Sequence, residues 1–375
     1  MKKLKPNIEP IENWKEMVKE GPVQYWGFFS KKELEANKGK LLMLDIDFGR
    51  ACSLRCPTCF RRKNVVDNGG IPDMSYNELL TVLKNAKKLG LKTIKYCGAG
   101  EPFENPLLLQ FLRDLKKLGV GSAIFTKGHV LGDNKLARKI FAGEGVKNAL
   151  DLCGKIYSFK TSILLSYQSF YSEIQDKLVG RKGHTKKRNK ALENLAQVGF
   201  NKTSPTRLAM ICAPIIKQIK DEVLNIYIFA RKRNIYPVPA YLMVSGKQLT
   251  KKFLRNYDLT SKEKIELHSK IYKWNIEQGL QTVEQIENEG IPCMAGIHPC
   301  NQVAAGLYLT LNGNVTSCPG DNRVIGNVRK ESIKEIWEKS ENFKRRGTFN
   351  CRCPPKDGKT IPLRLYREVL ERIKT

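Results

Sequence analysis

Short hydrophobic runs alternate with longer amphipathic segments along the middle of the chain. The hydrophobic runs predict β-strands and the amphipathic segments predict helices. Because the two kinds alternate, we expect one parallel sheet, either open and doubly wound or curled into a partial barrel. In both arrangements, ligands bind at the carboxyl ends of the strands. The predicted strands are 41–47, 93–97, 122–126, 160–166, 206–212 and 238–243.

Local signals locate the helices between these strands. Ser75 and Glu78 have the spacing of a capping box, in which each side chain accepts a hydrogen bond from the other residue's free N–H group. A second helix should begin at Asn105, with Pro106 at its first position, and end at Gly119. Further helices are predicted at 186–198, 218–233 and 262–278.

The pattern changes after residue 243, where a polar stretch and a helix lead into a cysteine-rich tail. This change predicts a second, smaller domain. The start of the chain contains Trp14, Trp26 and Phe29 among other aromatic residues, so this segment should pack on the core rather than form a flexible tail. The predicted division is an N-terminal segment 1–36, a core 37–245, a helical linker 246–292 and a cysteine-rich domain 293–375.

Composition limits the partners, the cellular compartment and the cysteine chemistry that we expect for this protein. The chain has 66 Lys and Arg against 37 Asp and Glu, a net charge of +29, which favours an anionic partner or reflects only a lysine-rich surface. It shows neither a membrane-spanning hydrophobic stretch nor the hydrophobic core of a signal peptide, so we expect a cytoplasmic protein with no membrane partner. Because the cytoplasm keeps thiols reduced, the 11 cysteines indicate metal or redox chemistry rather than a disulfide framework.

Three cysteines follow the first predicted strand within eight residues, as Cys52-Ser-Leu-Arg-Cys56-Pro-Thr-Cys59. Three thiolates can hold three irons of a cubane 4Fe-4S cluster and leave the fourth iron open to another ligand. A zinc site and free thiols are the alternatives, although structural zinc prefers four ligands in paired Cys-x-x-Cys units.

The spacing Cys-x3-Cys-x2-Cys at the end of a first strand resembles the signature of the radical S-adenosylmethionine (SAM) superfamily. The segment 98–102, Gly-Ala-Gly-Glu-Pro, is similar to the family's glycine-rich segment, which binds the amino group of SAM's methionine. Lys127 lies where the family often has Asn in a Thr-Asn-Gly sequence, and Ser166 resembles the polar residue that contacts SAM's ribose or carboxylate. Thr58 takes the place of a frequent aromatic residue, which Phe60 could replace. The resemblance therefore implies SAM contacts from Gly98, Gly100, Glu101, Pro102, Lys127, Ser166 and Phe60.

The tail contains five more cysteines and a predicted hairpin over 307–315, with Asn312-Gly313 at its turn. This pattern resembles the SPASM/twitch extension of radical SAM enzymes and implies an auxiliary 4Fe-4S cluster. A full SPASM domain would need seven cysteines for two clusters, so one cluster is expected. A structural zinc site is the alternative, because thiolates alone do not distinguish zinc from iron. The implied ligands are Cys300, Cys318, Cys351 and Cys353, with Cys293 as the substitute for one of them.

The resemblance implies a partial (βα)6 TIM-like barrel followed by a small cysteine-rich domain. It also implies reductive cleavage of SAM to a 5′-deoxyadenosyl radical, which takes a hydrogen atom from a peptide or from a small polyol or sugar. A low-potential donor of the flavodoxin or ferredoxin type would supply the electron, and the auxiliary cluster would transfer electrons. No acid or base is selected by the sequence, although Asp151, Asp258 and Asp321 are available.

Two alternatives remain open. The positive charge, densest in the run 181–190, is typical of a radical SAM enzyme that modifies RNA or a nucleotide. The other alternative is a non-catalytic module that binds metal or nucleic acid. The remaining cysteines and the histidines have no chemically informative spacing, so we expect them to be buried hydrophobic, surface or packing residues: Cys97, Cys153, Cys212, His129, His184, His268 and His298.

Overall fold

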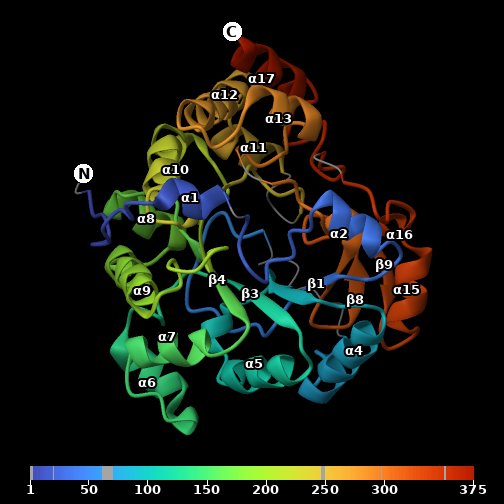
Figure 1. The fold of residues 1–375 in the computed structure, drawn as a ribbon. Coiled ribbons are helices and arrows are strands. Elements are labelled where there is room, and N and C mark those ends of the chain that lie inside the picture. Colours follow the sequence, from blue (N-terminus) through green and yellow to red (C-terminus); the bar gives the residue numbers. More distant parts are fainter. Residues whose placement is uncertain (1–2, 20, 61–70, 246–249, 297, 350–351) are drawn as a thin grey trace.

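The computed structural model describes residues 3–19, 21–60, 71–245, 250–296, 298–349 and 352–375. Within these residues the strands form one sheet in the order β6-β5-β4-β3-β2-β1-β7-β8-β9, and helices surround it (Figure 1). Strands β1 to β6 pair in parallel with their neighbours in the chain, so the predicted parallel sheet with helical crossovers is confirmed. The strands are β1 (Met43–Ile46), β2 (Thr93–Tyr96), β3 (Gly121–Thr126), β4 (Thr161–Ser166), β5 (Leu208–Cys212), β6 (Tyr236–Pro239), β7 (Gly306–Leu309), β8 (Asn314–Thr316) and β9 (Val324–Asn327).

The helices of the first part of the chain follow the predicted pattern with two differences. The capping box of Ser75 and Glu78 is present at the start of α4. Pro106, predicted at the first position of a helix, lies in a turn instead, because the Asn105 side chain accepts the N–H of Leu107 and delays the helix to Leu108. The helix predicted over 218–233 begins as a 3-10 helix. The helices are α1 (Trp14–Lys19), α2 (Lys31–Ala36), α4 (Tyr76–Lys88), α5 (Leu108–Lys117), α6 (Asn134–Ile140), α7 (Ala149–Tyr157), α8 (Ser172–Val179), α9 (His184–Val198) and α10 (Val223–Arg231), with 3-10 helices η1 (Pro102–Glu104), η2 (Ala142–Glu144) and η3 (Lys217–Glu222).

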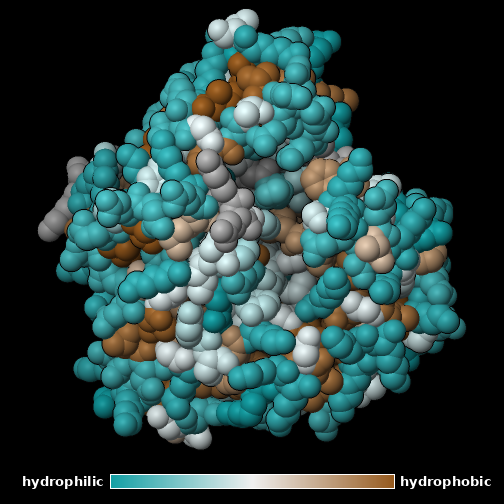
Figure 2. All heavy atoms as spheres, in the orientation of Figure 1, coloured by the Kyte–Doolittle hydropathy of each residue, from teal (hydrophilic) through white to brown (hydrophobic). Residues whose placement is uncertain are grey.

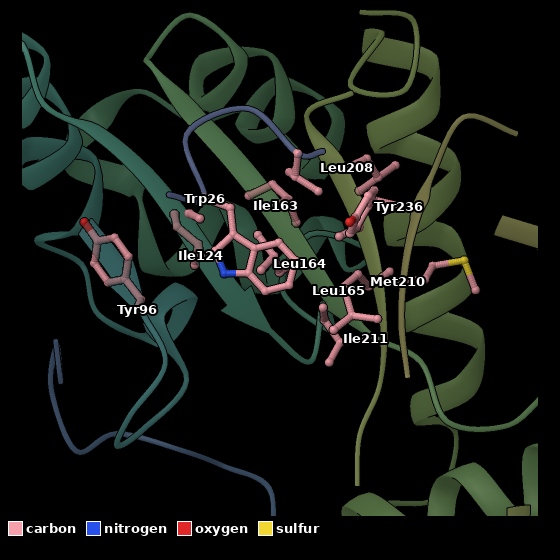
Figure 3. Packing of buried hydrophobic residues seen from close by; sticks show 14 of the residues in the cluster. Trp26, Tyr96, Ile124, Ile163, Leu164, Leu165, Leu208, Met210, Ile211 and Tyr236 are labelled. Atoms are coloured by element: carbon pink, nitrogen blue, oxygen red, sulfur yellow. The ribbon is translucent and has the colours of Figure 1, made fainter. Parts of the chain in front are cut away.

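Residues 24–27 of the N-terminal segment cover the amino ends of the strands. The Thr93 hydroxyl donates to the Tyr25 carbonyl, and the Ser162 hydroxyl donates to the Gln24 carbonyl. Trp26 is buried, and its ring meets those of Phe125 and Tyr236 edge-on, at centroid distances of 5.9 and 6.2 Å. Figure 3 shows Trp26 and Tyr236 among the hydrophobic residues of the sheet. Burial of so large a ring contributes about 3 kcal/mol. With this end covered, the carboxyl ends of the strands are the remaining place for a site within the barrel.

The cysteine-rich tail continues the sheet of the core. β7 pairs in parallel with β1, with Tyr308 beside Asp45, and β8 returns antiparallel to β7. The predicted hairpin is therefore confirmed, and Gly313 takes the left-handed conformation that its turn requires, with φ +83°. The parallel contact between β7 and β1 was not expected from the sequence. It joins the tail directly to the first strand of the core.

Helices of the second half of the chain gather beyond the sheet, and α12, α13 and α17 form one group (Figure 1). Within the described residues, none of the helices is long and hydrophobic enough to span a membrane. Hydrophilic side chains cover most of the face seen in Figure 2. These helices are α11 (Lys251–Tyr257), α12 (Ser261–Glu277), α13 (Val283–Glu289), α14 (Gln302–Ala305), α15 (Ile333–Lys339), α16 (Glu341–Lys344) and α17 (Leu365–Lys374).

Candidate functional site

The loop with the first three cysteines follows β1 at the carboxyl ends of the strands. Cys52 is exposed, Cys56 and Cys59 are half-buried, and the Cys59 N–H donates to the Cys56 carbonyl at 3.2 Å. Partial burial raises the pKa of Cys52 to about 12. Burial also raises the pKa of Cys56, where the nearby Lys127 ammonium opposes it. Cys52 and Cys56 therefore need a bound cation or cluster to stabilise their thiolate forms.

Loops after β2 and β4 hold this cysteine loop in place. The Glu101 N–H donates to the Ala51 carbonyl at 2.7 Å, and the Arg55 N–H donates to the Val179 carbonyl at 3.0 Å. A Cβ on Gly100 would lie 2.5 Å from the Gly49 carbonyl oxygen, and one on Gly180 would lie 2.7 Å from that of Arg55. Both glycines also have positive φ angles, so no other residue fits either position without strain.

A charged network that the sequence analysis missed fixes the residue after Cys52. The Glu104 carboxylate accepts the Ser53 N–H at 2.9 and 3.0 Å, and it also accepts the Ser53 hydroxyl. His129 Nε2 lies 2.8 Å from the same carboxylate, and Arg181 donates to the Ser53 hydroxyl at 3.0 Å. Partial burial raises the pKa of Glu104, but the hydrogen bonds from His129 and Ser53 outweigh it and bring the pKa to about 2. His129, expected only at the surface or in packing, is buried and serves this network.

The residues predicted to contact SAM converge at the ends of β2, β3 and β4. Glu101 is buried, which raises its pKa, and it accepts the Lys127 N–H at 2.8 Å and the Thr126 hydroxyl. The Lys127 ammonium in turn donates to the Ser166 hydroxyl at 2.8 Å. Pro102 opens η1 directly after Glu101 and is buried. Phe60, half-buried, follows Cys59 at the end of the described part of that loop.

Asp47 holds the glycine-rich segment against β1. Its carboxylate accepts the Ala99 N–H at 2.5 Å and the Tyr308 hydroxyl from β7. A Cβ on Gly98 would lie 1.4 Å from the carboxylate oxygen of Asp47, so only glycine fits there. Sequence analysis missed Asp47 and Tyr308, because their contact depends on the pairing of β7 with β1.

Four cysteines of the tail gather in the interior, and we call Cys293, Cys300, Cys318 and Cys353 the four-cysteine group. Cys293 and Cys353 lie close enough to interact, and this interaction raises the pKa of Cys293 and lowers that of Cys353. Burial raises the pKa of Cys300 and of Cys318, and both interact electrostatically with Cys353. Cys293, expected only as a substitute, thus lies within the group, whereas Cys351 lies outside the described residues.

The donor sets fit iron–sulfur clusters. In the described part of the chain, no three His, Cys, Asp or Glu side chains are close enough to share one metal ion. The thiolates of a cubane cluster each bind a different iron, so they do not need to converge on one point. Three thiols near a glycine-rich loop and four in a buried group match an open and a closed cluster, respectively.

Many of the positive side chains in the run 181–190 contact other groups of the same chain. Arg188 is buried and donates to the Ser169 carbonyl and the Gln175 side chain, while Arg181 contacts Ser53. Lys187 and Lys190 form ion pairs with Asp133 and Glu193. The run therefore has fewer charges to offer an anionic substrate than its composition indicates.

Comparison with known proteins matches two family models to the chain. Residues 46–223 match the family model of the radical SAM superfamily, and residues 300–357 match that of the SPASM iron–sulfur cluster-binding domain. The chain thus contains a radical SAM domain followed by a SPASM domain, as predicted, and the predicted fold class is confirmed. These domains imply a 4Fe-4S cluster with SAM and an additional iron–sulfur centre.

Individual relatives are distant. A cofactor-modifying protein for tungsten-containing aldehyde ferredoxin oxidoreductase, from Pyrococcus furiosus, is 22% identical over 313 residues, which cover 80% of each chain. Among solved structures, Streptococcus suis SuiB with its precursor peptide SuiA has a TM-score of 0.57 at 15% identity, covering 85% of this chain and 70% of that one. SuiB with SAM has a TM-score of 0.55 at 16% identity, covering 84% and 67%. At this identity, the likeness to SuiB shows a shared fold.

Proposed function

We propose that the chain is an enzyme that cleaves SAM reductively and abstracts a hydrogen atom from a peptide or small-molecule substrate. When bound, the reduced cluster and SAM together supply the 5′-deoxyadenosyl radical for that abstraction. The observation that carries the proposal is the attachment of the three-cysteine loop to the glycine-rich segment and to Gly180. It brings cluster ligands and SAM-binding backbone together at the carboxyl ends of the strands.

In this proposal Cys52, Cys56 and Cys59 hold the SAM-binding cluster. The backbone of 98–102 orients SAM's methionine, and Glu101 keeps that backbone in place through Lys127. The Lys127 ammonium, which donates to the Ser166 hydroxyl, would bind the anionic carboxylate of SAM. Phe60 is proposed beside the adenine. The chain's own part is therefore orientation of SAM and exclusion of water.

We propose the four-cysteine group as the ligand set of an auxiliary 4Fe-4S cluster, with Cys293 in the place first expected for Cys351. The interaction of Cys293 with both Cys353 and Cys300 supports this choice. A cluster with four protein ligands has no open iron for substrate, so it would transfer electrons. A donor of the flavodoxin or ferredoxin type would supply the electron for SAM cleavage.

For the substrate, we favour a peptide or another small molecule over RNA. SuiB, which shares the fold, has been solved with a precursor peptide, and the P. furiosus relative is named for modifying a cofactor. The internal ion pairs of the run 181–190 reduce the charge available to bind phosphates. The remaining positive charge is compatible with an anionic substrate.

The test is formation of 5′-deoxyadenosine by the anaerobically reconstituted protein with SAM and a strong reductant. We expect Cys52→Ala, Cys56→Ala and Cys59→Ala each to abolish it. Cys153→Ala, at a buried cysteine of α7, should leave it intact. A wild-type protein that carries iron and binds SAM but forms no 5′-deoxyadenosine with any substrate fraction would contradict the proposal.

The same assay distinguishes substrate classes. Peptide, small-molecule and RNA fractions are added separately, and the fraction that raises turnover identifies the class. Stimulation by a peptide or small-molecule fraction supports the proposal. Stimulation by RNA alone, with a steep dependence on salt, would replace it by the nucleotide-modifying alternative.

A further inference from the structure

Lys356 lies three residues beyond Cys353 and is buried, with 7% of its surface exposed. The side-chain ammonium of Lys356 donates to the Tyr241 carbonyl at 3.1 Å. Its backbone N–H donates to the Cys353 carbonyl at 2.8 Å. No carboxylate in the described part of the chain forms an ion pair with it. Burying a charge without an opposite charge is costly. The position therefore calls for an anion nearby. The Lys356 charge acts on the thiols of Cys293 and Cys353, and also on the neighbouring Lys264, which has its own partner in Asp258.

Lys95 approaches the four-cysteine group at Cys300. It is 5% exposed, forms an ion pair with Asp45 at 2.9 Å, and donates to the Gln302 side chain at 3.2 Å. Gln302 is two residues beyond Cys300, and the Lys95 ammonium interacts electrostatically with the Cys300 thiol. The contacts join β1 and β2 of the core to the start of the SPASM domain. Asp45 neutralises most of the positive charge of Lys95. Of the two lysines near the four-cysteine group, Lys356 is therefore the one without a carboxylate in an ion pair.

A cubane cluster with four thiolate ligands is negatively charged and becomes more so when it is reduced. A cation fixed nearby in a medium of low dielectric constant stabilises the reduced form more than the oxidised form. The reduction potential of an iron–sulfur cluster is therefore raised by nearby positive charge and lowered when that charge is removed.

We propose that Lys356 is the charge-compensating residue of the auxiliary cluster and raises its reduction potential, and that the Asp45 carboxylate limits the same effect of Lys95. The inference rests on the proposed ligand set of that cluster. It makes the auxiliary cluster a better electron acceptor than its four thiolates alone would allow.

The experiment uses the full chain with Cys52, Cys56 and Cys59 replaced by alanine, so that only the auxiliary cluster is present. Iron content and visible absorption establish loading, and a redox titration followed by electron paramagnetic resonance gives the midpoint potential. In this background we compare Lys356→Met, Lys356→Arg, Asp45→Asn and, as a control, Lys334→Met at an exposed lysine of α15.

We expect Lys356→Met to lower the midpoint potential, Lys356→Arg to restore it, and Asp45→Asn to raise it. Lys334→Met should leave it unchanged, because water screens an exposed charge. A purely structural role for Lys356 would reduce cluster yield without moving the potential. If Lys356→Met fails to load, Lys356→Gln takes its place, because it removes the charge but keeps a hydrogen-bond donor for the Tyr241 carbonyl. The same fall in the midpoint potential is expected of it. Asp45→Asn tests the Lys95 part of the proposal separately.

Two outcomes would overturn the inference, and they are distinguishable. Loaded Lys356→Met and Asp45→Asn variants with the wild-type potential would refute the role of these charges while leaving the auxiliary cluster in place. Absence of any iron–sulfur cluster in the triple-alanine background would refute the proposed ligand set itself.

Discussion

Replacing Glu104 by glutamine should loosen the cysteine loop, because this carboxylate holds Ser53 directly after Cys52. At about 1.4 kcal/mol per pKa unit, the fall in the pKa of Glu104 from 4.5 to about 2 corresponds to roughly 3 kcal/mol of interaction with its partners. Glutamine keeps one acceptor oxygen but loses the charge, so we expect the loss to be about 2 to 3 kcal/mol.

Hydrogen exchange measured by mass spectrometry is the appropriate assay, because the effect is local. A loss of about 2 to 3 kcal/mol in the free energy of local opening accelerates exchange by roughly 30-fold to 150-fold. The acceleration should be confined to residues 51–56 of the anaerobically loaded protein. Iron bound by the loop should fall in the same variant.

Glu144→Gln is the matched control. Glu144 forms an ion pair with Arg113, but at the surface, where such a pair is worth about 1 kcal/mol or less. Unchanged exchange of 51–56 in Glu104→Gln, or equal acceleration in Glu144→Gln, would refute the positioning role of Glu104.

Three further outcomes are expected. In Gly132→Ala the new Cβ would lie 1.8 Å from the Lys187 carbonyl oxygen. We therefore expect the free energy of unfolding, measured by urea denaturation, to fall by about 3 kcal/mol or more. Gly143→Ala is the control and should be nearly neutral, because a Cβ there has open space around it. Burial lowers the pKa of His268 to about 4, so below pH 6.5 the unfolded chain takes up a proton that the folded chain does not. His268 alone should reduce stability by about 1.4 kcal/mol per pH unit from pH 6.5 towards 4, and the buried His184 adds a slope of its own. His268→Gln should therefore remove only the first of these contributions to the measured slope. Lys127→Met should raise the SAM dissociation constant about tenfold in equilibrium dialysis, and Lys177→Met, at an exposed lysine of α8, should not.

The parts of the fold that sequence predicted are those encoded by local patterns. Hydrophobic runs located five of the six core strands within about two residues, and Ser75 with Glu78 located the start of α4. The sixth strand was placed two residues late at its start. It begins at Tyr236 and contains Pro237 and Pro239, residues that sequence reasoning assigns to turns or strand edges.

Contacts between distant segments could not be predicted in the same way. Nothing local in Gly306–Leu309 indicates that this arm of a hairpin also pairs with β1. The resemblance to the SPASM/twitch extension gave Cys293 only as a substitute ligand, because its position beside Cys353 is set by tertiary structure. Glu104 and His129 come from separate loops and form no motif, so only their meeting at Ser53 reveals them.

The pairing of β7 with β1 has a consequence for how the two centres are joined. β1 leads into the loop that carries Cys52, while β7 lies between Cys300 and Cys318. Asp47 accepts hydrogen bonds from Ala99 of the glycine-rich segment and from Tyr308 of β7. Because these bonds and the parallel ladder are all buried, a displacement of β7 must also displace the backbone proposed to orient SAM. The hairpin that begins with β7 therefore supports the proposed SAM-binding segment through Tyr308 and Asp47, and the same part of the chain provides the four-cysteine group.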